Sequence, residues 1–130
     1  MTKWTIEKPQ TGRHIVQDDG LVCVYIDKRG DMTLSIAAHD SIGKPSYCHM
    51  LSDSNGNVGI MGATEKDFNT YSVGYKSVSS HGGQHNLRIA CKAVTKKHAL
   101  IPADGVLRYM AYIDDGVLII SKKQVPQKVK

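Results

Sequence analysis

The sequence predicts a single all-β domain, an antiparallel sandwich or barrel of about eight strands joined by tight glycine-containing turns. Three observations lead to this class. Among the 130 residues, Val and Ile occur eleven times each and Gly twelve times, against seven Leu and two Glu. Strand and turn formers therefore outnumber the best helix formers. Turn signals are dense, and the runs between them are short and alternate between apolar and polar residues.

Glycine dipeptides punctuate the chain at intervals that suit short strands. They are Asp19-Gly20, Arg29-Gly30, Asn55-Gly56, Gly82-Gly83, Asp104-Gly105 and Asp115-Gly116. Asp-Gly and Asn-Gly favour hairpins because the turn positions need a positive φ. The strongest hairpin signal is Asp114-Asp115-Gly116, which is flanked by two apolar runs.

The apolar runs define the expected strands. They span 11–17, 21–27, 31–38, 46–51, 58–62, 70–78 and 86–95, followed by a final pair at 106–113 and 117–121. The first three should form a meander, and the run 21–26 is apolar on both faces, which is typical of a central strand. In the third strand, Met32, Leu34, Ile36 and Ala38 would share one face.

Three further segments complete the expected architecture. The stretch 39–57 is the least regular and is expected to be a long loop or crossover. A short helix fits 64–69, which opens with a Thr cap followed by an acidic residue. We expect residues 1–120 to form the domain, and residues 121–130 to be a basic C-terminal tail or an edge strand.

Charge is distributed unevenly along the chain, whose formal net charge is +5. Residues 1–65 carry a net charge of −2, and residues 66–130 carry +7. A basic half favours nucleic acid or another anionic partner. A solvated sheet face whose lysines keep a β protein soluble is the alternative explanation.

The strand predicted at 86–95 would organise part of this charge. Arg88 and Lys92 would share its outward face, and further cations follow it in the sequence. The candidate residues for nucleic acid or an anionic partner are Arg88, Lys92, Lys96, Lys97, Arg108, Lys122 and Lys123. Such a row could follow the phosphates of a nucleic acid.

No motif in the sequence predicts catalysis, a cofactor or a metal. His81, His85, Cys91 and His98 form H-x3-H-x5-C-x6-H, but Gly82-Gly83 disfavours the helix that would bring the first two together. Three scattered cysteines are not a disulfide framework and favour a reducing compartment. The acids lie mostly at turns, which leaves few for acid–base chemistry.

The sequence therefore predicts a non-enzymatic β module that acts by association. We expect a structural subunit of a larger assembly, such as a virion or another particle, because small antiparallel folds often hide their edges against other copies. The alternatives are a cytoplasmic nucleic-acid-binding domain and a sandwich binding a small ligand or carbohydrate through loops 39–57 and 81–85. With no apolar run of about 18 residues and no recognisable signal peptide, the expected location is the cytoplasm or an assembled particle.

Overall fold

The computed structural model describes residues 20–74 and 87–129 and confirms the all-β class. Most of its regular structure is strand, with two helices of six residues each. In chain order the elements are β1 (Cys23–Asp27), β2 (Met32–Leu34), α1 (Ile36–Ser41), β3 (Tyr47–Ser52), β4 (Val58–Ala63), β5 (Tyr71–Ser72), β6 (Arg88–Ile89), α2 (Lys92–Lys97), β7 (Val106–Asp114), β8 (Val117–Ile120) and β9 (Gln127–Val129).

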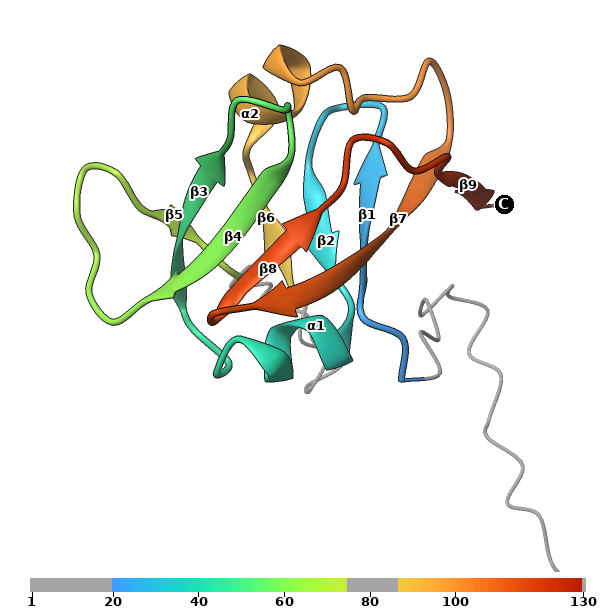
Figure 1. The fold of residues 1–130 in the computed structure, drawn as a ribbon. Coiled ribbons are helices and arrows are strands. Elements are labelled where there is room, and N and C mark those ends of the chain that lie inside the picture. Colours follow the sequence, from blue (N-terminus) through green and yellow to red (C-terminus); the bar gives the residue numbers. More distant parts are fainter. Residues whose placement is uncertain (1–19, 75–86, 130) are drawn as a thin grey trace, which may run out of the picture.

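The strands form one antiparallel sheet that curls into a nearly closed barrel (Figure 1). Their order is β5-β3-β4-β8-β7-β1-β2-β6, so the two ends of the sheet are the two shortest strands, β5 and β6, of two residues each. The amide of Gly74, just after β5, donates to the carbonyl of Arg88 on β6 at 3.0 Å. This bond bridges the remaining gap and leaves little open sheet edge at the seam.

Strand β7 is the longest element and is paired along both sides. One side pairs with β1. The other side pairs with β9 near the start of β7 and with β8 near its end. Between those two partners, the side-chain amide of Gln124 takes the place of a strand residue. Its Oε1 accepts from the Met110 amide and its Nε2 donates to the Met110 carbonyl, both at 2.7 Å. The basic segment after β8 is thereby fixed along β7 and ends in an edge strand.

The pairing register places each connection at one of two barrel ends. Asp27 pairs with Val106, and Val58 pairs with Ile120. Accordingly, the turns β1–β2 and β3–β4, the α2 connection and the β8–β9 segment share one end. The α1 connection and the β7–β8 turn lie at the other, and Figure 1 shows α1 and α2 at opposite ends. The β4–β5 loop starts at the α1 end and stands out from the side of the barrel beside β3.

The barrel interior is filled by branched and aromatic side chains from almost every strand. The fully or nearly fully buried residues include Val24, Ile26, Met32, Leu34, Val58, Ile60, Ile89, Tyr109, Leu118 and Ile120. The predicted hairpin at 106–121 is confirmed. Asp115 and Gly116 both have positive φ, 52° and 77°, which is the geometry of a two-residue type I′ turn.

Two predicted strands end earlier than expected and continue as helices. The strand predicted at 31–38 stops at Leu34, because Ser35 caps α1. Its hydroxyl accepts from the amide of Ala38, so Ile36 is exposed on the helix and does not continue the buried face. The strand predicted at 86–95 is β6 alone, and the chain from Lys92 is α2.

Of the other predicted elements, three strands are confirmed, one helix is wrong, one strand is shorter than predicted, and one strand lies outside the described residues. Strands 21–27, 46–51 and 58–62 are confirmed to within two residues at each end. The helix at 64–69 is wrong: this segment consists of turns, one of them capped by the Asp67 carboxylate, which accepts from the Asn69 amide. Strand 70–78 is reduced to β5, and the strand at 11–17 lies outside the described part of the chain.

The β3–β4 turn yields a pH-dependent prediction. Hydrogen bonds from the side chain and amide of Asn57 lower the pKa of Asp53 from its ordinary value of 3.8. A lowered folded-state pKa means that the carboxylate stabilises the fold fully above pH 3.8 and progressively less as pH falls below it. We expect Asp53→Asn to lower Tm at neutral pH, and the gap to the unmodified protein to shrink on acidification.

Thermal unfolding followed across the acid range measures that gap. Asp104→Asn is the control, since Asp104 is an exposed acid whose ion pair with Lys128, at 3.2 Å, should contribute little. A gap for Asp53→Asn that stays constant below pH 4 would show that the turn does not depend on the charged carboxylate.

Candidate association surface

The outer face of the barrel carries a continuous apolar row. Leu51 pairs with Gly59, Gly59 with Ile119, and Ile119 with Tyr112, so the row crosses β3, β4, β8 and β7. Their neighbours Ile60 and Leu118 are fully buried in the core. Because side chains alternate along a strand, the row must point away from the core.

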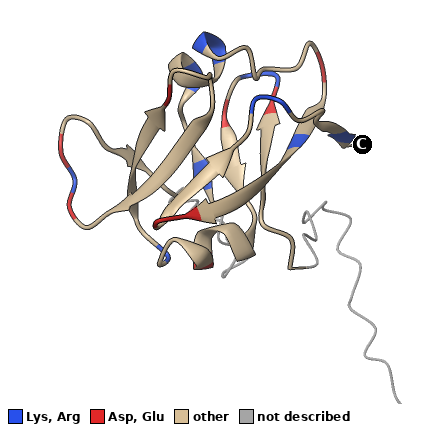
Figure 2. Ribbon diagram, viewed as in Figure 1, with Lys and Arg blue, Asp and Glu red and all other residues tan. Residues whose placement is uncertain are grey.

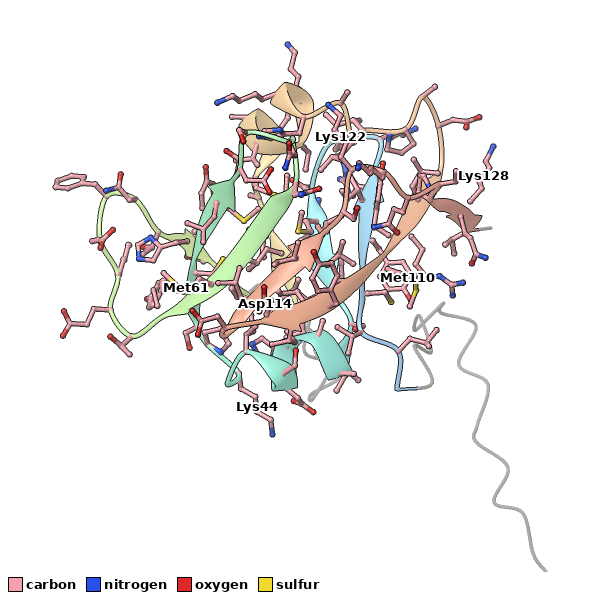
Figure 3. The ribbon with its side chains drawn as sticks, in the orientation of Figure 1. Lys44, Met61, Met110, Asp114, Lys122 and Lys128 are labelled. Atoms are coloured by element: carbon pink, nitrogen blue, oxygen red, sulfur yellow. The ribbon has the colours of Figure 1, made fainter. Side chains whose placement is uncertain are left out.

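Neighbouring rows widen this surface, which we call the apolar strip. Its members are Leu51, Gly59, Met61, Met110, Tyr112, Val117 and Ile119. Tyr112 is 51% exposed and Met110 is 45% exposed. Figure 3 shows Met61 and Met110 toward opposite sides of this face.

Glycine at position 59 allows the strip to be flat. A Cβ built there would lie 2.9 Å from the Val117 Cγ1 and 3.4 Å from the Leu51 Cβ. The side chains of the two flanking strands therefore close over the glycine from both sides. Leu51 and Val117 can therefore pack together across position 59 on the outer face.

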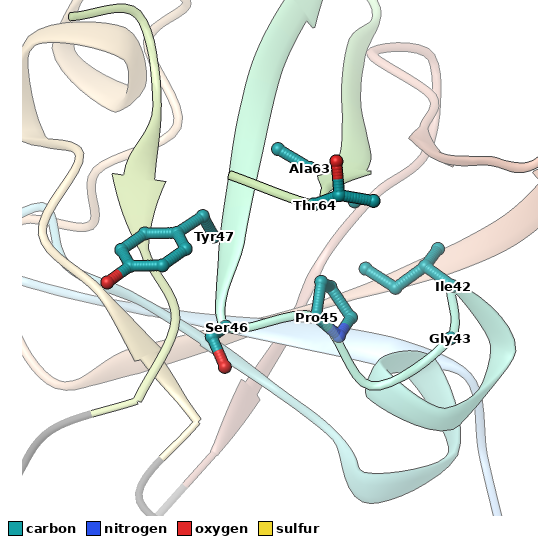
Figure 4. A pocket seen from close by; sticks show the side chains of 8 residues that line it. Ile42, Gly43, Pro45, Ser46, Tyr47, Ala63 and Thr64 are labelled. Atoms are coloured by element: carbon teal, nitrogen blue, oxygen red, sulfur yellow. The ribbon is translucent and has the colours of Figure 1, made fainter. Parts of the chain in front are cut away.

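Two hollows lie beside the barrel. A groove of about 740 Å³ lies between the strip and the β4–β5 loop, and is lined by His49, Leu51, Met61 and Phe68 among others. The Phe68 side chain is fully exposed. The second hollow, about 440 Å³, lies between the end of α1 and the edge of β3–β4, and Figure 4 shows its lining by Pro45, Tyr47 and Thr64 among others.

The structure separates the predicted basic row into two groups. Arg88 forms an ion pair with Asp31, and Arg108 hydrogen-bonds Gln127, so both arginines tie strands together. The other five are exposed at the α2 end of the barrel. They are Lys92, Lys96 and Lys97 on α2, and Lys122 and Lys123 after β8.

The cysteines of the described residues are poorly placed for nucleophilic chemistry. All three cysteines are free and buried, and burial raises the pKa of Cys48 to about 11 and that of Cys91 to about 12. These thiols are protonated at neutral pH and are weak nucleophiles. Cys48 lies in the core while its neighbour His49 lines the outer groove, and His39 hydrogen-bonds the Pro45 carbonyl at 2.9 Å.

Metal and membrane features are also absent from the part of the chain that the structure describes. Within residues 20–74 and 87–129, no three or more His, Cys, Asp or Glu side chains are grouped so that they could hold a metal. His81 and His85 lie outside those residues. No described helix has the length and apolar character needed to cross a bilayer.

The sequence contains the residues of the apolar strip, but the alternation of apolar and polar residues does not show that they lie on the surface. All four residues of β8 are apolar, and Met110, Tyr112 and Ile113 on β7 are exposed. A strand that is apolar on both faces is central in a sandwich, but in a single curled sheet one of its faces must lie outside. Because the sheet closes on itself, the outward-facing apolar residues of β7 and β8 lie on the surface of the barrel.

Comparison with models of known protein families, with curated proteins and with solved structures finds no match. The surface chemistry of the barrel is therefore the basis for a functional proposal.

Proposed function

We propose that the protein is a non-enzymatic association module, a structural subunit that joins copies of itself through the apolar strip. The observation that supports the proposal is the row Leu51–Gly59–Ile119–Tyr112 on the outer face of four adjacent strands. Monomeric soluble proteins seldom expose contiguous apolar patches of this kind unless the patch is a contact site. The strip lies on a hydrogen-bonded sheet, so little conformational entropy is lost on docking.

A second copy is the partner that fits the strip best. A two-fold contact brings one patch against itself, so a charged patch would oppose like charges. The strip contains no Lys or Arg, and the nearest acid is Asp114, which shares the row of Met61 and Val117 at its margin. An uncharged apolar surface is complementary to its own copy, and Tyr and Met are enriched at the centres of such contacts.

Replacing strip residues should weaken self-association. We expect Met61→Thr combined with Tyr112→Thr to raise the dissociation constant by at least about tenfold, because a buried Tyr at a contact centre contributes more than about 1.4 kcal/mol. Threonine keeps the preference for strand, so the barrel should stay folded. Sedimentation velocity over a wide range of protein concentration measures the constant.

Ile36→Thr is the matched control. Ile36 is 60% exposed and apolar, but it lies on α1, which follows β2 and contributes nothing to the strip. It should associate like the unmodified protein. If the double variant also associates normally, the strip is not the contact, and an unmodified protein that stays monomeric at every concentration overturns the proposal.

The nucleic-acid alternative has less support from the described residues. Single-strand binding adds aromatic side chains on which bases stack beside the cations. In the described part of the chain, Tyr25 and Tyr109 are buried, Tyr112 belongs to the strip, and Tyr47, Tyr71 and Phe68 lie on β3, β5 and the loop beside them. Among these described residues, no exposed aromatic ring lies with the lysines at the α2 end.

A further inference from the structure

The two ends of the barrel carry opposite charge. Figure 2 shows Lys and Arg gathered at the α2 end, and acidic residues at the β7–β8 turn and the β4–β5 loop. The basic end consists of the exposed residues Lys28, Arg29, Lys92, Lys96, Lys97, Lys122 and Lys123. The acidic end has the exposed residues Asp40, Asp114 and Asp115, and the β4–β5 loop that starts there adds Glu65 and Asp67 at its side, with only Lys44 and Lys66 as described cations near them.

The acids at the basic end are already engaged within the fold. Asp27 pairs with Arg29, Asp31 with Arg88, and Asp104 with Lys128. The fourth, Asp53, accepts three hydrogen bonds from its own turn. Among the described residues, the three lysines of α2 have no carboxylate partner, so their positive charge faces outward.

At the acidic end, three carboxylates are similarly uncompensated. Asp40 pairs with Lys44 at 3.8 Å, and Asp67 caps its own turn. Glu65, Asp114 and Asp115 have no cation within ion-pair distance in the described part of the chain. Asp114 and Asp115 are adjacent in the β7–β8 turn, so their two negative charges lie close together.

The ends are too far apart to neutralise each other within one molecule. The nine residues of β7 run from one end to the other and span about 30 Å at the usual rise of a strand. Charges at a protein surface are screened over about 8–10 Å at physiological salt. Each end therefore presents its own charge to whatever approaches it.

We propose that barrels stack head to tail, the basic end of one copy docking on the acidic end of the next. This inference rests on the proposed self-association and adds a second contact of a different kind. The strip contact is two-fold and closes on itself, whereas a head-to-tail contact leaves one free end of each sign and continues into a ring or filament. Electrostatic complementarity of this kind sets orientation and speeds encounter.

Charge reversal at one end at a time tests the stacking. Lys92→Glu with Lys96→Glu and Lys97→Glu replaces all three lysines of α2 by acids, and Glu65→Lys with Asp40→Lys leaves four lysines against three acids at the other end. All five positions are exposed and lie outside the strip, so circular dichroism and Tm should show both variants folded. We expect each variant alone to lose the species larger than the strip dimer, and an equimolar mixture to restore them as alternating copies.

Salt provides the second measurement. For the unmodified protein at low salt, we expect the large species to dissociate as salt is added, with the apparent association constant falling at least about tenfold. The strip dimer should persist, since an apolar contact is not screened. Sedimentation velocity resolves the two species in the same titration.

The outcomes separate the two proposals. If both charge variants assemble like the unmodified protein, or the mixture fails to restore assembly while both remain folded, head-to-tail stacking is wrong and the strip contact stands. If Met61→Thr with Tyr112→Thr has no effect on self-association, but the two charge-reversal variants and their mixture behave as expected, the strip proposal fails and stacking stands. If the basic end instead binds a labelled oligonucleotide with a steep salt dependence and the copies do not stack, nucleic-acid binding replaces the stacking proposal.

Discussion

Ile60→Ala should lower the free energy of unfolding by about 2–5 kcal/mol. Ile60 is fully buried on β4, directly opposite Met50 on β3 and Leu118 on β8. Truncation removes three carbons from the centre of the barrel. Strands held on both sides by ladder hydrogen bonds cannot close the resulting cavity, so both the transfer and cavity costs remain.

Urea unfolding followed by far-UV circular dichroism measures the change in the free energy of unfolding, with Ile36→Ala as control. Ile36 is 60% exposed on α1, so the same chemical change there should leave stability almost unaffected. An equal loss in the two variants would mean that Ile60 is not at the centre of the core.

Ser35→Ala is the second large effect, expected to cost about 2–4 kcal/mol. The Ser35 hydroxyl oxygen accepts from the amides of Cys23 and Ala38, both at 3.1 Å, and donates to the Leu21 carbonyl at 2.7 Å. One side chain therefore caps α1 and fixes the start of β1. Alanine leaves two buried amides without an acceptor, and the burial of Ser35 keeps water from replacing it.

Ser41→Ala separates this role from ordinary helix effects. Ser41 is at the other end of α1 and donates to the Ala38 carbonyl at 2.6 Å, but it is exposed, so water can substitute. We expect a loss below about 1 kcal/mol there, and partial recovery in Ser35→Thr, which keeps a capping oxygen. Equal losses at both serines would argue against the bridging role of Ser35.

The strands and turns could be predicted because local chemistry determines them. Asp115-Gly116 needs two positive φ values, and the runs on either side are β-branched, so the β7–β8 hairpin follows from neighbours in sequence. The helix α1 could not be predicted because Met32-Thr33-Leu34 and the residues after it keep an apolar alternation through position 38. A cap at Ser35 breaks that pattern, and its partners Cys23 and Leu21 are distant in sequence.

The candidate surface was less predictable because it depends on which strands become neighbours. The cations of the predicted strand 86–95 form no strand row. Instead, Arg88 pairs with Asp31, and the lysines extend from a helix at the barrel end. The alternation of side chains assigns two faces to a strand but does not say which face is exposed to solvent. Only the register Gly59–Ile119–Tyr112 joins outward-facing apolar residues from separate segments into one surface.

The pairing of β1 with β7 determines when the chain can fold during synthesis. Cys23 lies beside Met110 in the barrel, so the first described strand has no partner on that side until nearly the whole sequence has left the ribosome. The hairpins β3–β4 and β7–β8 can form early, because each is local in sequence. Closure has to wait for contacts between distant segments, which places the protein among slow-folding β topologies. Truncated nascent chains that end before β7 would therefore expose the apolar face of β1, and would depend on chaperones.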